Sequence, residues 1–90
     1  MPTVRLLIKG KVQGVFYRQT AKETADAKGI TGWVRNTDDG NVEIAASGNK
    51  DALQAFIDWC HVGPARAKVE EVDVTPLSDQ LFETFEVKRG

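Results

Sequence analysis

The sequence is poor in the residues that build redox, metal and membrane functions. It has one cysteine, Cys60, and one histidine, His61, so neither an intramolecular disulfide nor a cysteine-based zinc site can form. Its longest apolar run is far too short for a secretion signal or a membrane span, so we expect no membrane partner. Together these features favour a reduced, cytoplasmic setting.

An excess of charge of one sign is also missing. Lysine and arginine number 12 and aspartate and glutamate 13, a formal net charge of −1, which predicts no nucleic acid partner and requires any anion site to be local. Repeats, low-complexity tracts and linkers are absent as well. We therefore expect a single domain over residues 1–90, with a monomer as the default state.

The first half of the chain alternates strand and helix patterns. Residues 4–10 alternate as a strand, residues 17–28 have a helical stripe, and Gly29 is suited to end that helix. Two extended runs follow, residues 33–37 and 42–46. The turn residues Asp38-Asp39-Gly40-Asn41 between them predict a hairpin, because Gly40 tolerates a positive φ.

The second half predicts one helix and two strands. Asn49 can cap a helix that Gly63-Pro64 ends. Its apolar stripe follows helical spacing: Leu53, Phe56, Ile57 and Cys60. Strands are expected over residues 67–74 and 82–87, separated by Pro76, with a bulge near Glu70-Glu71 where the valine alternation shifts.

The order β-α-β-β-α-β with a terminal strand predicts an α+β fold, the ferredoxin-like sandwich. In that fold a mostly antiparallel sheet with a short fifth strand carries two helices on one face. Because the first two strands run parallel, the loop from Lys11 to Tyr17 and the strand end at Asn36 are expected at the same edge of the sheet. Many functions use this architecture, so it does not identify one.

The loop and the helix after it could bind a phosphate. Gly14 lets backbone N–H groups turn inward, the free N–H groups at the start of the helix favour an anion, and Arg18 adds a planar charged fork. On the local pattern alone, an ordinary strand-to-helix connection with an exposed arginine is the favoured reading, because glycine loops before helices are common. Asn36 could likewise simply bond its own turn.

Two segments resemble the motifs of the acylphosphatase family. The first is Gly10-Lys11-Val12-Gln13-Gly14-Val15-Phe16-Tyr17-Arg18. The second is Gly32-Trp33-Val34-Arg35-Asn36, followed by Asp39-Gly40-Asn41-Val42-Glu43. Weaker similarity continues through residues 55–60 and 63–69, so the resemblance covers nearly the whole chain.

The resemblance implies an enzyme that hydrolyses acyl phosphates to carboxylate and phosphate without metal, cofactor or covalent intermediate. The implied phosphate-binding residues are Lys11, Val12, Gln13, Gly14, Val15, Phe16, Tyr17 and Arg18. Arg18 and Asn36 are the implied catalytic residues, Asn36 positioning the attacking water. Free phosphate or sulfate would bind as product or mimic. Many members end on an aromatic residue, whereas this chain ends Val87-Lys88-Arg89-Gly90. That difference is expected not to touch the site.

Other candidates have simpler roles. Cys60 lies on an apolar stripe and is expected to be a buried thiol, and His61 fits a capping role in the last helical turn. An RNA-binding module with this fold would need exposed stacking aromatics and a basic surface, which residues 42–47 and the net charge do not supply. A domain that binds an anion without catalysis remains open, and Asn36 favours the enzyme over it.

Overall fold

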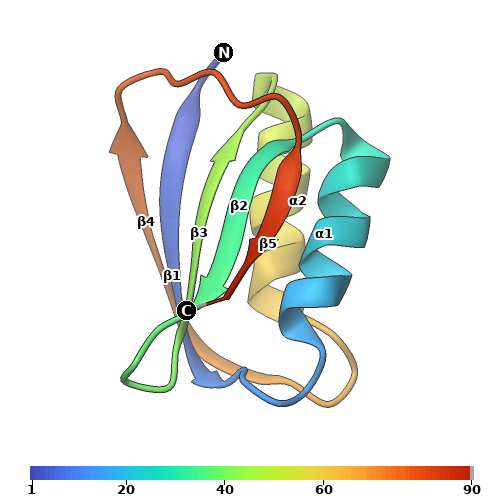
Figure 1. Ribbon diagram of the computed structural model, residues 1–90, viewed down its shortest axis with the longest axis vertical. Coiled ribbons are helices and arrows are strands. Elements are labelled where there is room, and N and C mark those ends of the chain that lie inside the picture. The colour runs from blue at the N-terminus through green and yellow to red at the C-terminus, as the bar shows by residue number, and fades with distance from the viewer. Residues whose placement is uncertain (90) are drawn as a thin grey trace.

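Five strands and two helices alternate along the computed structural model, which describes residues 1–89. The elements are, in order, β1 (Thr3–Lys11), α1 (Tyr17–Lys28), β2 (Thr31–Asn36), β3 (Val42–Ser47), α2 (Lys50–Val62), β4 (Lys68–Leu77) and β5 (Phe85–Lys88). The strands form one sheet in the order β4-β1-β3-β2-β5, and both helices cover the same face of it (Figure 1). The expected ferredoxin-like α+β fold, with its short fifth strand, is confirmed.

Strand directions decide which loops can meet. Both β1 and β2 pair antiparallel with β3, so they run parallel to one another although they are not neighbours. The fifth strand, β5, pairs parallel with β2. The carboxyl ends of β1, β2 and β5 therefore lie at one edge of the sheet, as Figure 1 also shows.

The core lies between the sheet and the two helices. α1 contributes Tyr17, Ala21 and Ala25, whereas Lys28, at the end of the predicted stripe, is exposed. α2 contributes a second set, Leu53, Phe56 and Cys60. The ring of Phe56 contacts that of Phe85 on β5, with centroids 5.8 Å apart. Burial of these side chains holds β5 against the helices and so fixes the end of the chain beside α1.

The helix caps follow the sequence closely. Gly29 ends α1 with φ 71°, and the next N–H, of Ile30, donates to the carbonyl of Ala25 at 2.9 Å. At the start of α2, the Asn49 side chain accepts from the Ala52 N–H at 2.9 Å. His61 Nδ1 lies 3.0 Å from the Ile57 carbonyl in the last turn of α2. Both predicted caps are confirmed, and His61 has a local role at the helix end.

The edge strands differ from the prediction in their bounds. β4 continues through Pro76 to Leu77 instead of ending at Val74, and Pro76 is opposite Val4 of β1. Proline is tolerated because β4 is an edge strand, where one side of the backbone has no strand to bond. β5 begins at Phe85, not at Phe82. The predicted bulge is confirmed, since Lys9 pairs with Glu71 and Gly10 with Val69, leaving Glu70 unpaired.

The face of the sheet without helices carries a buried carboxylate between two arginines. Glu43 Oε2 is 2.5 Å from Arg5 Nε, and its Oε1 is 2.5 Å from Arg35 Nη2. Burial disfavours ionisation of Glu43, but the hydrogen bonds from Arg5 and Arg35 outweigh it and lower the pKa of the carboxyl. Arg5 and Arg35 are thereby paired with a carboxylate on the sheet.

Candidate active site

The loop between β1 and α1 is anchored at two points and strained at its end. Val12 and Val15 are buried in the core, while Gly14 and Phe16 face solvent. Gly14 has φ 74° and Phe16 has φ 64°, an uncommon conformation for a bulky residue. Because Phe16 is also 73% exposed, its side chain gains little packing in return. The strain is therefore a property of the loop's shape.

The start of α1 is left open to an anion. Phe16 is the cap residue, and among the described residues no side chain accepts a hydrogen bond from the first turn. The first turn contains no acidic residue either. The first helical N–H groups and the positive end of the helix dipole thus keep their preference for negative charge. Arg18, the second residue of α1, adds a full charge at the same place.

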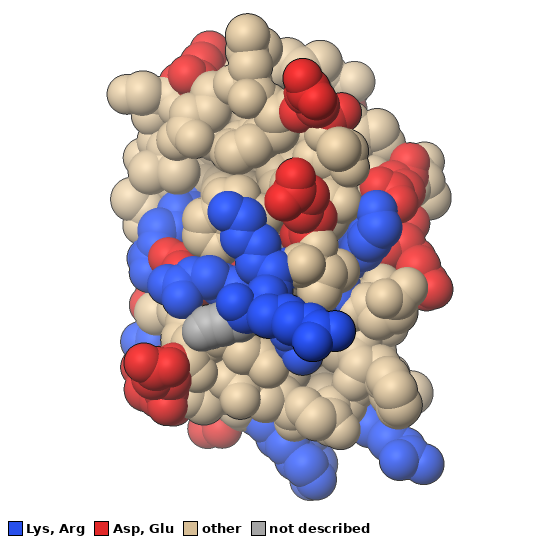
Figure 2. All heavy atoms as spheres, in the orientation of Figure 1, with Lys and Arg blue, Asp and Glu red and all other residues tan. Residues whose placement is uncertain are grey.

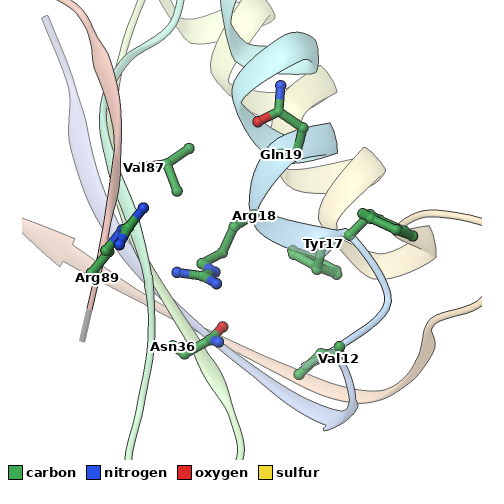
Figure 3. Close-up of a pocket in the computed structure, with 9 residues that line it drawn as sticks. Val12, Tyr17, Arg18, Gln19, Asn36, Val87 and Arg89 are labelled. Atoms are coloured by element: carbon green, nitrogen blue, oxygen red, sulfur yellow. The ribbon is translucent and has the colours of Figure 1, made fainter.

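A cavity of about 540 Å³ opens at this edge of the sheet. It is lined by residues of the β1–α1 loop, the first turn of α1, the end of β2 and the end of the chain: Val12, Gly14, Phe16, Tyr17, Arg18, Gln19, Asn36, Val87 and Arg89. Figure 3 shows the Arg18 guanidinium entering from α1 and Asn36 lying below it, at the end of β2. Two residues that are 18 positions apart in sequence are thus brought to one cavity.

The Arg18 side chain reaches across from α1 to the last strand. Its Nη1 donates to the carbonyl of Lys88 at 3.2 Å. One N–H of the guanidinium therefore orients the group, while the planar fork keeps further donors for a ligand. β5 consequently acts as a support for the arginine.

Asn36 does not make the hydrogen bonds of the turn that follows it. Thr37 does: its N–H donates to the Asn41 carbonyl at 2.9 Å, and its hydroxyl accepts from the Asn41 N–H at 3.1 Å. The Thr37 hydroxyl also donates to Asp39. The alternative role left open by the sequence, a side chain spent on its own turn, is therefore filled by Thr37, and the Asn36 amide lines the cavity.

Gln13 braces the loop against this turn. Its side-chain amide donates to the carbonyls of Thr37 and Asn41, both at 2.8 Å. These bonds connect the β1–α1 loop to the residue directly after Asn36. The separation between the loop and Asn36 is thus fixed by a side chain from within the loop.

The predicted phosphate-binding residues divide into two groups. Five of them line the cavity: Val12, Gly14, Phe16, Tyr17 and Arg18. Lys11, Gln13 and Val15 do not. Lys11 is exposed at the end of β1, Val15 anchors the loop in the core, and the Gln13 side chain is used as the brace.

The expectation that the end of the chain does not touch the site is wrong. Val87 and Arg89 line the cavity, and the Lys88 carbonyl accepts from Arg18. The physical reason is the parallel pairing of β5 with β2, which brings the end of β5 to the edge where Asn36 lies. Gln19 also lines the cavity and was not predicted from the sequence, although its position directly after Arg18 in the first turn of α1 could have indicated it.

The groups that the sequence set aside stay outside the site. Cys60 is fully buried, and burial raises the pKa of its thiol to about 12. Tyr17 lines the cavity, but its hydroxyl donates to the Cys60 carbonyl at 2.7 Å, and burial raises the pKa of that hydroxyl. Within residues 1–89 no three His, Cys, Asp or Glu side chains are grouped to hold a metal ion. No helix in that range is long and apolar enough to span a membrane.

Comparison with known proteins places this arrangement in a family. The family model described as acylphosphatase matches residues 4–87. An acylphosphatase of Marinobacter nauticus is 55% identical over 89% of this chain and 88% of its own length. One from Acidovorax sp. is 54% identical over 93% and 90%. The crystal structure of acylphosphatase from Bacillus subtilis superimposes with a TM-score of 0.94 at 37% identity, covering 98% of this chain and 99% of that one.

A ferredoxin-like sandwich with a cavity between the loop ahead of its first helix and the ends of β2 and β5 defines the structural class of the protein. The chain belongs to the acylphosphatase family. It is accordingly a hydrolase, as the sequence motifs predict.

Proposed function

We propose that the protein hydrolyses the carboxyl-phosphate bond of acyl phosphates by direct attack of water. In this proposal Arg18 and the backbone N–H groups of the loop bind the phosphoryl group, and Asn36 orients the water. The observation that carries the proposal is the meeting of these three parts in one cavity (Figure 3). No metal ion, cofactor or covalent intermediate has a part in it.

The binding step relies on groups that are already in position. The phosphoryl oxygens would lie against the start of α1, where no side chain of the described residues caps the helix. The Arg18 fork would bond two of the oxygens, while its hydrogen bond to the Lys88 carbonyl keeps it in place. Because these donors do not reorganise during the reaction, they stabilise the charge of the transition state at little cost.

Beyond binding the phosphoryl group, the proposed reaction requires few catalytic groups from the protein. The leaving group is a carboxylate whose conjugate acid has a pKa of about 4, so it can depart without a general acid. Phosphoryl transfer through a loose transition state depends mainly on positioning and charge stabilisation. The Asn36 amide can accept a hydrogen bond from the water and donate one to the substrate. An amide is too weak a base to remove the proton, which in this proposal passes to a phosphoryl oxygen of the substrate.

The test is the hydrolysis of benzoyl phosphate in the presence of EDTA, with p-nitrophenyl phosphate as the contrasting substrate. The wild type is expected to hydrolyse only the anhydride. Arg18→Gln should lower kcat/KM by about 10²–10³-fold, and Asn36→Ala should lower kcat by about 10²-fold while phosphate still inhibits at its wild-type concentration. Arg66→Gln, at an exposed position in the α2–β4 connection, is the matched control and should leave both constants unchanged.

Two outcomes would contradict the proposal. An Asn36→Ala variant with wild-type kcat would remove that residue from the mechanism. A folded wild type that binds phosphate but turns over no acyl phosphate would be a protein that binds an anion without catalysis.

A further inference from the structure

The cavity contains a second arginine besides the one proposed to bind the phosphoryl group. In the proposed function, Arg18 and the amides at the start of α1 serve the phosphoryl group. Arg89 lines the same cavity but belongs to the end of the chain, directly after β5. Figure 3 shows the Arg89 side chain on the β5 side of the cavity, away from Val12 and Tyr17. The two arginines thus approach the substrate from different elements.

No acidic residue balances Arg89 within the cavity. Of the described residues that line it, the charged ones are Arg18 and Arg89 alone. The neighbouring Lys88 is directed elsewhere, with its Nζ 5.2 Å from the centre of the Trp33 ring. Figure 2 shows a cluster of basic side chains on the face of the molecule that Figure 1 presents. The wall formed by the end of β5 therefore favours an anion.

The cavity also has room for more than a phosphoryl group. Its volume of about 540 Å³ is in the range of sites that take a whole small molecule. Beside Arg89 lies Val87, and the exposed Phe16 ring borders the opening from the loop side. An acyl chain bound with its phosphate on Arg18 would have apolar contacts along its length and a cation on the β5 side.

We propose that Arg89 binds a second anionic group on the acyl part of the substrate, so that the preferred substrates are acyl phosphates with a carboxylate on the acyl group. This inference rests on the proposed function, since it names the substrate class of the same cavity. Arg89 is a specificity-determining residue here, and the cleavage reaction itself does not involve it. Its fork can bond a carboxylate through two parallel N–H donors.

The experiment compares benzoyl phosphate with 3-carboxybenzoyl and 4-carboxybenzoyl phosphate. The aromatic ring is rigid and prevents the carboxylate from attacking its own acyl phosphate. Wild type, Arg89→Gln and Arg89→Lys are assayed on each, with Arg66→Gln as the control for loss of an exposed arginine. The ratio of variant to wild type is taken for each substrate, which cancels differences in intrinsic reactivity.

We expect Arg89→Gln to lower kcat/KM for at least one carboxylated substrate about threefold to tenfold, mainly through KM, and to change benzoyl phosphate less than twofold. Arg89→Lys should restore part of the loss. The preference should also weaken as salt is raised, because Arg89 is exposed.

Three results would overturn the inference. Equal losses on all three substrates would assign Arg89 to the phosphoryl group, and unchanged kinetics on all three would remove it from substrate binding. A wild type that prefers benzoyl phosphate would exclude the proposed substrate class. Failure of the proposed function gives a separate result, in which the wild type turns over none of the three.

Discussion

Replacing Gln13 by alanine tests whether catalysis depends on the position of the β1–α1 loop relative to Asn36. The side-chain amide donates to the carbonyls of Thr37 and Asn41, both at 2.8 Å, and so holds the loop against the residue after Asn36. Neither carbonyl is orphaned by the change. The Thr37 carbonyl still accepts from the Gly40 N–H and the Asn41 carbonyl from the Thr37 N–H. The loss is therefore two net hydrogen bonds, with no unpaired buried group left behind.

From this count, Gln13→Ala should lower the free energy of unfolding by about 1–3 kcal/mol, since each net hydrogen bond contributes about 0.5–1.5 kcal/mol. The effect of Gln13→Ala on kcat should be larger than this modest loss of stability suggests. A shift of about 1 Å between the loop and Asn36 can cost up to about 10²-fold in rate. We expect kcat to fall about tenfold or more, with a smaller change in KM because Arg18 and the α1 amides remain.

The assays are urea unfolding and hydrolysis of benzoyl phosphate. Gln54→Ala is the matched control, because Gln54 also donates from its side chain, to Asp58 at 2.9 Å, on an exposed face of α2. If Gln13 acts through Asn36, the effects of Gln13→Ala and Asn36→Ala on kcat should not add in the double variant. Reduced stability with unchanged kcat would refute the reasoning and leave Gln13 as a brace for the fold only.

Two predictions concern stability. Glu43→Gln should destabilise the protein at pH 7 by about 1.5–3 kcal/mol, because it replaces a charged acceptor between Arg5 and Arg35. The folded-state pKa of Glu43 is lowered, so wild type has this stability above about pH 4.5 and loses it as pH falls through the folded pKa. The difference between the urea midpoints of the two proteins should thus shrink as pH falls below about 4.5; a constant difference would contradict the assignment. Tyr17→Phe, which leaves the buried Cys60 carbonyl without its 2.7 Å donor, should cost about 1–3 kcal/mol in the same assay, and an unchanged midpoint would count against that bond.

Features encoded by short stretches of sequence were predictable. The caps at Gly29 and Asn49, the hairpin at Gly40 and the bulge at Glu70 each depend on residues within a few positions. The physical requirement in each case is local, either a positive φ, a short polar side chain or a shift in alternation. Pro76 shows the limit of such rules. A proline predicts a strand end only if both sides of the strand are paired, and the edge position of β4 is set by the order of the whole sheet.

The parts of the site that the sequence could not supply depend on contacts between distant residues. Gln13 lies inside a predicted phosphate loop, yet its side chain bonds residues 24 and 28 positions away. Arg89 and Val87 reach the cavity because β5 pairs parallel with β2. The sequence of residues 85–88 does not by itself predict the direction of that strand or the strand it pairs with. Periodicity predicts that a strand exists, whereas its neighbours follow from how the hydrophobic faces of all the elements pack together.

The residues proposed to catalyse the cleavage and those proposed to select the acyl group come from different segments of the chain. The groups proposed for the phosphoryl transfer come from the start of α1 and the end of β2, which are also the segments that carry the family motifs. The wall proposed to meet the acyl group comes from the end of β5. The two parts are joined by the pairing of β5 with β2 and by the hydrogen bond from Arg18 to the Lys88 carbonyl. Because that bond uses the backbone of β5, the side chain of residue 89 can change while the arginine that holds the phosphate keeps its support. Substitutions at this end of the chain are therefore expected to change which acyl phosphate is preferred and to leave the rate of the cleavage step nearly constant.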